Sequence, residues 1–486
     1  MEQKILLAGY NIDSDVINEL KQNSPKREDI TPETLSAAYA RISRDPSPIY
    51  ELRKLARQEV EKARRSNSNI IFKMGHHSVA EHAVFNFDLI GISRLAVESI
   101  EHFRLSSFTE KSQRYITLEN DFIIPSEIKE SGFENEFVKL VKKQNEFYHI
   151  LNEKLQKYVF EKYKDLAGEQ KNKSLLEGWA KEDARYITSL ATQTQLGLTL
   201  NARNLELMFR RFASQKNVEI KEIANKMFSL VQNIAPSIIL FTDSNDYDEK
   251  TYDLIKEEVE KYNLSSGIST DEDEVVLSKY TFNADDVLIA SLIFSSTNLP
   301  MEQCLNKAAK ISLAEKENII KTSFKYMQFY DAVLREFENI DLMFDLIVSA
   351  SCFAQLKRHR MATIIAQQYD PNLGVKIPPS IIEIKMDKEF MDIISQTNDL
   401  YEKINSKNQI ASQYVLTNAH RRRVLFKCNA RELYHISRLR EDVHAQWDIR
   451  NISSKMAQEA KKVMPLTMMT IGGKDKYPEI YQQIFK

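Results

Sequence analysis

The residues best suited to chemistry in this 486-residue chain form a short basic cluster around position 359. Arg358, His359 and Arg360 are consecutive, and Gln355 precedes this triplet. Two guanidiniums beside an imidazole can bind oxyanions through paired hydrogen bonds and can orient a heteroaromatic ring. An Arg-His-Arg triplet is also typical of a solvated helix end. The triplet alone does not decide between the two.

A second polar cluster lies earlier, in a segment that resembles a loop. Glu110, Ser112 and Arg114 place a carboxylate, a hydroxyl and a guanidinium in close succession, with Gln113 between them and Tyr115 behind. Such a set could hold a polar ligand, but an exposed loop of the same composition needs no ligand. The context of both clusters is therefore needed.

That context is an internal repeat. Two landmarks recur in the same order: Phe-Asp-Leu-Ile at 87–90 and 344–347, and Asn-Ala-Arg at 201–203 and 429–431. One shared landmark could be chance, but two in order indicate a duplication followed by divergence. We expect a first copy over residues 1–242, a polar linker over 243–273 with one helix in it, and a second copy over 274–486.

Hydrophobic periodicity predicts the elements that position these residues. Apolar residues partly alternate over 84–89, which indicates a half-buried strand followed by a helix. Around 137–155 and 390–404 they recur at three- and four-residue steps, which predicts long amphipathic helices. Each copy is therefore expected to combine a short sheet with long helices.

Composition narrows the class of protein. The chain has 67 Lys and Arg against 69 Asp and Glu, so it lacks the overall basic field that holds nucleic acid or an anionic membrane. None of its 11 glycines forms a phosphate-binding glycine loop, so side chains must hold any nucleotide phosphate. A cytoplasmic protein is favoured, because three cysteines cannot form a fully paired framework and because the sequence shows no signal-like or 18-residue apolar segment.

Longer motifs resemble the flavin-dependent thymidylate synthases. In the first copy, Glu81-His82 leading to Phe85 and Phe87 resembles the family's strand motif, and residues 110–115 resemble its signature loop. In the second copy, the family's Arg-His-Arg stands at 358–360, and its C-terminal motif is matched at 429–433, 439–440 and 445–450. The resemblance implies an α+β fold in two tandem copies, each with a short, mainly antiparallel sheet.

The departures from the family pattern are complementary. The first copy has Ser99, His102, Phe103 and Phe212 at positions where the family has Gln, Arg, His and Arg. The second copy has Ala366, Gln368, Asp370 and Gln413 where the family has Glu, Ser, Arg and Arg. Each copy thus retains what the other has lost, which predicts sites composed of residues from both.

The resemblance assigns roles to particular residues. For dUMP it implies Glu110, Ser112, Gln113, Arg114, Arg185, Gln355, Arg358 and Arg440. For FAD it implies His82, Arg358, His359, Arg360, Asn429, Arg431 and His435. Arg440 and Ser112 would orient the substrate and stabilise developing charge, with no covalent nucleophile and no metal.

The implied reaction is reductive methylation of dUMP to dTMP, with methylenetetrahydrofolate as carbon donor and NADPH as reductant. Because the family forms homotetramers, a duplicated chain is expected to form a homodimer with pseudo-tetrameric symmetry. Two alternatives stay open. One is a flavin enzyme of the same fold acting on another pyrimidine nucleotide or methylene donor. The other is a non-catalytic scaffold that binds a nucleotide or a protein.

Overall fold

The computed structural model describes residues 2–20, 29–42, 45–73, 75–119, 121–262 and 273–485. The chain divides into two compact units. Unit 1 comprises Met1–Lys181, Thr188–Ser266 and Met391–Val415, and unit 2 comprises Glu182–Ile187, Gly267–Phe390 and Leu416–Lys486. A helix, α12 (Asp246–Glu260), lies in the expected linker, whereas residues 263–272 of that linker lie outside the described residues. The boundaries proposed for the two copies stay a prediction.

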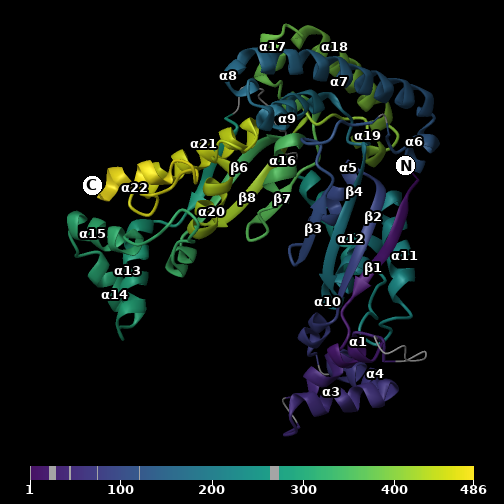
Figure 1. The fold of residues 1–486 in the computed structure, drawn as a ribbon, viewed down its shortest axis with the longest axis vertical. Helices are drawn as coiled ribbons and strands as arrows, with labels where there is room; N and C mark the ends of the chain where they lie inside the picture. Colours follow the sequence, from purple (N-terminus) through teal and green to yellow (C-terminus); the bar gives the residue numbers. More distant parts are fainter. Residues whose placement is uncertain are drawn as a thin grey trace. The chain divides into compact units, whose positions relative to one another are not determined.

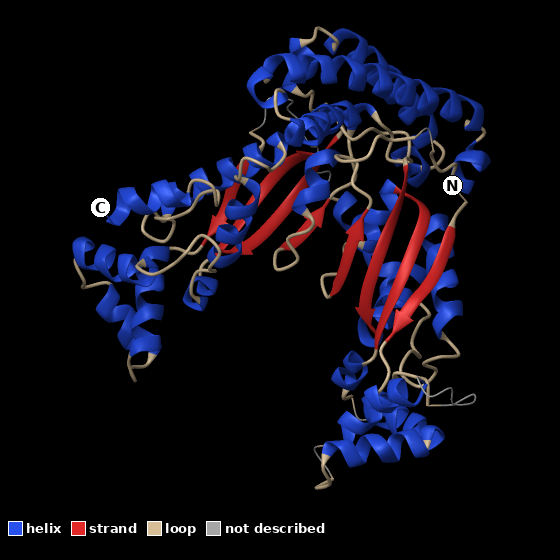
Figure 2. Ribbon diagram, in the orientation of Figure 1, coloured by secondary structure: helices blue, strands red, loops and turns tan. Residues whose placement is uncertain are grey.

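Both units contain a four-stranded sheet with the same topology (Figure 2). In unit 1 the order is β1 (Lys4–Tyr10), β2 (Val84–Ser93), β4 (Gln193–Asn201), β3 (Ser106–Glu110). In unit 2 it is β5 (Val275–Tyr280), β6 (Asp341–Ser349), β8 (Arg421–Asn429), β7 (Thr363–Ala366). All neighbouring strands are antiparallel. The expected α+β class and the repeat are confirmed.

The strands are amphipathic, which explains why each sheet buries one face. Phe85, Phe87 and Leu89 of β2 are buried in the core of unit 1, whereas the intervening Asn86 and Asp88 are exposed. This alternation is the expected consequence of side chains pointing to opposite faces of a strand. The strand predicted over 84–89 is therefore confirmed.

Helices make up most of the remaining structure (Figure 1). Those of unit 1 are α1 (Ser14–Leu20), α2 (Glu33–Arg41), α3 (Ile49–Gln58), α4 (Val60–Ser68), α5 (Arg94–Ile100), α6 (Ser126–Ser131), α7 (Glu134–Lys162), α8 (Lys164–Ala167), most of α9 (Lys173–Ala184), α10 (Ala202–Ala213), α11 (Val218–Val231), α12, most of α18 (Asp387–Asn405) and α19 (Gln409–Gln413). Short turns are η1 (Asn69–Lys73), η2 (His77–His82) and η3 (Gln170–Asn172).

The other helices belong to unit 2. They are α13 (Ala284–Ser296), α14 (Met301–Ala308), α15 (Leu313–Phe324), α16 (Ala350–Leu356), α17 (Pro379–Glu383), α20 (Ala430–Arg440), α21 (Trp447–Val463) and α22 (Tyr477–Phe485), with the short turns η4 (Arg185–Ile187), η5 (Arg335–Asn339) and η6 (Pro371–Leu373). No helix in the described ranges has the length and apolar character needed to cross a bilayer.

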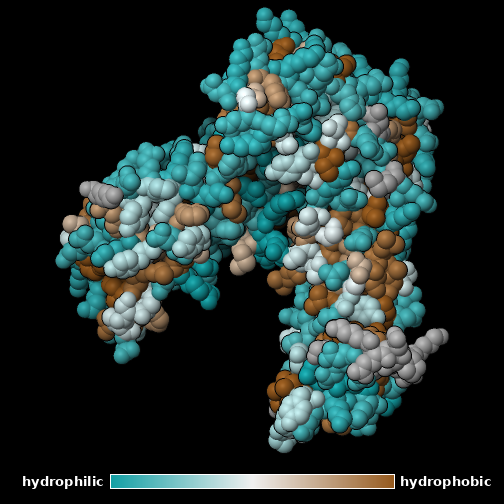
Figure 3. All heavy atoms as spheres, in the orientation of Figure 1, coloured by the Kyte–Doolittle hydropathy of each residue, from teal (hydrophilic) through white to brown (hydrophobic). Residues whose placement is uncertain are grey.

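The two long helices predicted from periodicity are present as α7 and α18, and they contact each other within unit 1. Gln144 of α7 donates from Nε2 to Thr397 Oγ1 of α18 at 2.9 Å, and Lys143 Nζ donates to Gln396 Oε1 at 2.9 Å. The surface of α7 visible in Figure 3 is mostly hydrophilic. Its apolar stripe therefore faces the protein interior, as expected for an amphipathic helix.

Each unit contains a segment from the other half of the chain. Residues 391–415, from the second half, belong to unit 1, and residues 182–187, from the first half, belong to unit 2. We call residues 182–187 the exchanged segment. It is hydrogen-bonded to the main chain of unit 2, because Ala419 N donates to Tyr186 O at 2.9 Å. Neither unit is therefore completed by one half of the sequence alone.

Unit 2 also buries an uncharged histidine, His420. Its Nδ1 accepts a hydrogen bond from Thr417 N at 2.9 Å, which places the ring proton on Nε2. Burial lowers the pKa of His420 from about 6.5 to about 3. The native protein therefore keeps this ring neutral at pH values where the unfolded chain takes up a proton.

We expect His420 to make the protein less stable in mild acid. Below pH about 6.5 this histidine takes up a proton in the unfolded state, whereas in the native state it stays neutral until pH about 3. The free energy of unfolding therefore falls as the pH drops. The slope approaches about 1.4 kcal/mol per pH unit. Urea unfolding between pH 7 and 5 should show a shallower pH dependence for His420→Gln than for the unchanged protein. The variant His76→Gln, which changes an exposed histidine, is the matched control.

Candidate active site

Two predicted site residues of the second copy, Gln355 and His359, contact a third, Arg440, which is the last residue of α20. Arg440 Nε donates to His359 Nε2 at 2.9 Å, and Arg440 Nη2 donates to the carbonyl oxygen of Gln355 at 3.1 Å. Gln355 lies in the last turn of α16, where carbonyl groups lack partners within the helix and a cation is favourable. One guanidinium therefore fixes both the end of α16 and the triplet that follows it.

His359 is held as a neutral ring. Only 3% of its surface is exposed, and burial, with the nearby charge of Arg440, holds its pKa well below its usual range. Because Nε2 accepts from Arg440, the ring proton lies on Nδ1, 3.3 Å from Glu432 Oε1. The His435 ring stands 5.8 Å from that of His359, edge to face. The structure thus brings together His359, Arg440 and His435.

The flanking residues Arg358 and Arg360 are exposed, as expected at a solvated helix end, whereas His359 between them is buried. Gln355 is 8% exposed, and its amide nitrogen has no hydrogen-bond partner among the residues that the structure describes. An unpaired buried donor is costly unless a ligand or water accepts from it. Two exposed guanidiniums and an unpaired amide donor fit a ligand that carries phosphate and carbonyl oxygens, as FAD and dUMP do.

Two predicted flavin ligands make structural contacts at the start of α20. Asn429 caps the helix by accepting from Glu432 N at 2.8 Å. Arg431 donates from Nε to Val333 O at 2.9 Å and lies 3.1 Å from Glu338 Oε1. These contacts position the helix that carries Arg440 and do not include Arg440 or His359.

Arg185 is the predicted residue that comes from the first half of the chain into unit 2. It is 5% exposed, and its Nη2 donates to Ser351 Oγ of α16 at 2.7 Å. Ser351 and Gln355 are four residues apart in this helix, so both lie on one face, about 6 Å apart along its axis. The buried guanidinium of Arg185 is therefore held on the face of α16 that also carries the unpaired amide.

A tyrosine fixes the segment that bears Arg185. Tyr186 OH donates to Asp448 Oδ2 at 3.0 Å and accepts from Gln446 Nε2 at 2.7 Å, while Ser349 Oγ donates to the same Asp448 oxygen at 2.6 Å. All four side chains are buried. Sequence reasoning missed Tyr186 and Ser351, since each contacts a residue far along the chain.

In unit 1, the carboxylate of Glu110 is paired with Arg94. Both Glu110 oxygens lie 2.5 Å from Arg94 Nη1, and both side chains are nearly buried. Although burial opposes its charge, Arg94 has a raised pKa because of Glu110. Arg94 was not predicted, but a charge directly after the apolar β2 strand was a usable signal, since such a charge must be paired. The second copy has Ala350 and Ala366 at the corresponding positions.

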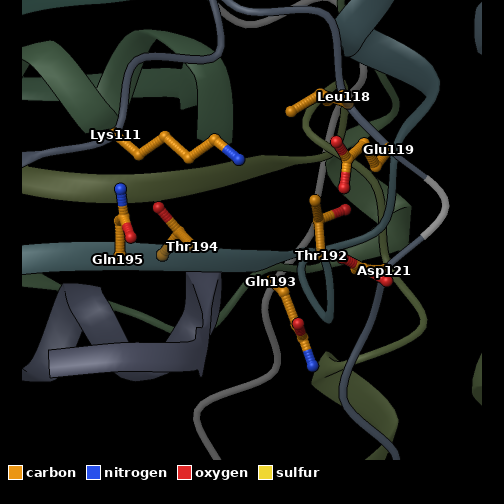
Figure 4. A pocket seen from close by; sticks show the side chains of 8 residues that line it. All are labelled: Lys111, Leu118, Glu119, Asp121, Thr192, Gln193, Thr194 and Gln195. Atoms are coloured by element: carbon orange, nitrogen blue, oxygen red, sulfur yellow. The ribbon is translucent and has the colours of Figure 1, made fainter. Parts of the chain in front are cut away.

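The rest of the signature loop turns around Ser112. Ser112 Oγ accepts from Arg114 N at 3.2 Å, Gln113 is buried, and the Arg114 guanidinium carbon lies 5.6 Å from the centre of the Tyr115 ring. A hollow of about 10 Å³ beside this loop has room for about one water. Its lining residues are Lys111, Leu118, Glu119, Asp121, Thr192, Gln193, Thr194 and Gln195 (Figure 4).

His82 is the one predicted flavin ligand in unit 1. It ends η2, and its ring packs edge-on against Tyr39, with ring centres 4.6 Å apart. Both side chains line an open hollow of about 260 Å³. The structure therefore places His82 at a cavity of its own within unit 1.

Three of the family positions lost from the copies make local structural contacts. Phe103 and Phe212 form an edge-to-face pair with ring centres 5.5 Å apart, and Phe212 is 2% exposed. In the second copy, Asp370 caps η6 by accepting from Asn372 N at 2.9 Å. Hydrophobic and turn-forming contacts thus replace the polar functions at these positions.

The thiols are poorly placed for chemistry. Cys304, Cys352 and Cys428 are all buried, and burial raises the pKa of the Cys352 and Cys428 thiols. A protonated thiol is a weak nucleophile. Within the described ranges, no group of three or more His, Cys, Asp or Glu side chains is arranged to hold a metal ion.

Comparison with known proteins supports the repeat seen in the fold. The family model described as thymidylate synthase complementing protein matches residues 28–237 and again 277–466. The chain belongs to this family. A flavin-dependent thymidylate synthase of Clostridium tetani is 32% identical over 216 residues, which are 43% of this chain and 82% of that protein. The corresponding protein of Geobacter sulfurreducens is 30% identical over 212 residues, covering 43% and 80%.

Members of this family differ in length. The protein named UPF0159 protein Ta1429 of Thermoplasma acidophilum is 21% identical over 472 residues, which cover 88% of this chain and 93% of that one. A solved flavin-dependent thymidylate synthase from Helicobacter pylori, complexed with FAD and dUMP, is 16% identical with a TM-score of 0.31, covering 49% of this chain and 100% of that one. The Thermoplasma acidophilum protein therefore matches most of the duplicated chain.

Proposed function

We propose that this chain catalyses the reductive methylation of dUMP to dTMP, with FAD bound, methylenetetrahydrofolate as carbon donor and NADPH as reductant. The observation that carries the proposal is the buried contact of Arg185 with Ser351, on the helix face that carries the unpaired amide of Gln355. A buried guanidinium beside an unpaired amide donor is suited to an anionic, carbonyl-bearing ligand. Membership of a family whose relatives are named flavin-dependent thymidylate synthases supports the same conclusion.

The side chains would act mainly by binding and by electrostatic stabilisation. Arg185, Arg114 and Arg358 would neutralise the nucleotide phosphate and hold the pyrimidine carbonyl oxygens. Arg440 would stabilise the charge that develops on the pyrimidine ring, and Ser112 would orient that ring. Because neutral His359 accepts from Arg440 Nε, it holds this guanidinium in one orientation, and its own ring adds no positive charge.

The remaining substrate contacts would come from Glu110, Gln113 and Gln355. FAD would be held by Arg358, His359, Arg360 and His435, with Asn429, Arg431 and His82 contributing. When bound, the flavin would supply the hydride chemistry that no side chain can perform. No covalent nucleophile is required, in keeping with the burial of all three thiols.

We further propose that each site is composed of residues from both copies and that the chain forms a cytoplasmic homodimer. Complementary losses support the composite site, since the first copy retains Arg185 and the second has Gln413. Light scattering at micromolar concentration should give a dimer. A monomer with full activity would contradict the proposed assembly.

An anaerobic assay tests the proposed reaction. Purified protein carrying flavin should transfer labelled carbon from methylenetetrahydrofolate to dUMP when NADPH is present, and dTMP should accumulate. Omission of any one of these three compounds should abolish the labelled product. Bound, NADPH-reducible flavin with no label in dTMP would refute the proposed reaction.

A further inference from the structure

One more side chain of the exchanged segment is bound tightly within unit 2. Asp183, in the last turn of α9, accepts from Trp447 Nε1 at 2.7 Å through Oδ1 and from Ser380 Oγ at 2.5 Å through Oδ2. Tyr186 stacks on the Trp447 ring, with ring centres 5.8 Å apart and planes at 19°. The segment that carries Arg185 is thus anchored on both sides of this arginine.

The position of Asp183 is locally unfavourable, so its contacts must compensate. A carboxylate at a helix C-terminus opposes the helix dipole. Burial, reinforced by Glu182, raises the pKa of Asp183 to about 7 against the opposing hydrogen bonds. Strongly perturbed pKa values cluster at functional sites.

Unit 1 contains an equivalent anchor that lacks these features. Tyr414 OH donates to Glu219 Oε2 at 2.8 Å and bonds Asn217, as Tyr186 bonds Asp448 and Gln446 in unit 2. Glu219 also accepts from Ser93 Oγ at 2.6 Å, as Asp448 accepts from Ser349. The two anchors therefore match group for group.

Three of the differences between the anchors remove the contacts described for Asp183, Arg185 and Trp447. Ala411, Gln413 and Val218 stand in unit 1 where Asp183, Arg185 and Trp447 stand in unit 2. The shared tyrosine–carboxylate contact accounts for holding the exchanged segment. The Asp183–Trp447 contact occurs only at the anchor that bears the arginine, so holding the segment does not explain it.

We propose that Asp183 is a positioning residue for nucleotide binding, which holds the guanidinium of Arg185 on the face of α16 through its bonds to Trp447 and Ser380. Arg185 begins the three-residue turn η4, and so short a turn fixes its own orientation poorly. The bonds to Trp447 and Ser380 add a second constraint to that of Tyr186, because they fix the residue two places before Arg185. This inference rests on the proposed binding of dUMP.

Calorimetric titration of the flavin-loaded full chain with dUMP tests the inference. Asp183→Ala should raise the Kd by about 3–10-fold, as expected when a contribution of about one hydrogen bond is lost. Asp183→Asn, which can still accept from Trp447, should restore most of the affinity. Tyr414→Phe is the matched control, since it removes a hydrogen bond from the other anchor and should leave the Kd unchanged.

The outcomes separate this inference from the proposed function. If the unchanged protein does not bind dUMP, the proposed function fails, and the inference fails with it. If it binds dUMP and Asp183→Ala binds equally well, only the inference fails. Should Asp183→Ala not fold, Trp447→Phe keeps the stacked ring but loses the donor, and an unchanged Kd in this variant overturns the inference.

Discussion

Replacing Arg185 by glutamine should weaken the binding of dUMP by roughly 10–150-fold. Arg185 is buried with its guanidinium on Ser351, so it would bond the nucleotide without competition from bulk water. A hydrogen bond to a charged group contributes about 1.5–3 kcal/mol, which corresponds to that range of affinity. Equilibrium dialysis with labelled dUMP gives the Kd directly.

The control for this substitution is built into the duplication. Gln413 occupies the equivalent position in the second half, so Gln413→Ala should bind dUMP as tightly as the unchanged protein. Circular dichroism would show that both variants are folded. Equal losses in the two variants, or none for Arg185→Gln, would argue against a role for Arg185 at the site.

The second large effect concerns stoichiometry, because flavin should saturate near one FAD per chain. Two of the degenerate positions of the first copy are occupied by the packed pair Phe103 and Phe212, which removes a histidine and an arginine that the family uses. In the second copy, Asp370 puts a carboxylate where the family has an arginine. Two like charges about 4 Å apart repel by roughly 1 kcal/mol in water and by more when partly desolvated.

Absorbance titration of apoprotein with FAD measures this number. A single class of sites, fully reducible by NADPH, should end near one equivalent. In the first copy the positions equivalent to the Arg-His-Arg triplet are His102, Phe103 and Arg104. The variant Arg104→Ala serves as a control, since it changes this degenerate triplet and should leave the end point in place. Saturation near two equivalents, with both populations reduced, would show that the degenerate positions still function.

Local sequence patterns predicted several elements of the fold. The alternation at 84–89 predicted β2, and three- and four-residue spacing predicted α7 and α18, because each pattern reflects the burial of one face of an element. The order of the repeated landmarks predicted two domains of one topology, and the two sheets have the same strand order.

What the sequence could not show are contacts between distant segments. The bond from Arg185 to Ser351 joins residues 166 apart, and neither is marked by any periodicity. The pair of Arg94 and Glu110 could have been anticipated from a buried charge, but the exchange of residues 182–187 and 391–415 could not. Packing between the halves of the chain determines these features, and a linear pattern does not record it.

Calorimetric titration of flavin-loaded protein with dUMP shows whether residues of both copies serve one site. The unchanged chain should show one site per chain, and Arg114→Ala in the first copy and Arg358→Ala in the second should each weaken that one site. Two sites per chain, of which each variant loses only one, would show that the copies bind nucleotide separately and that no composite site exists.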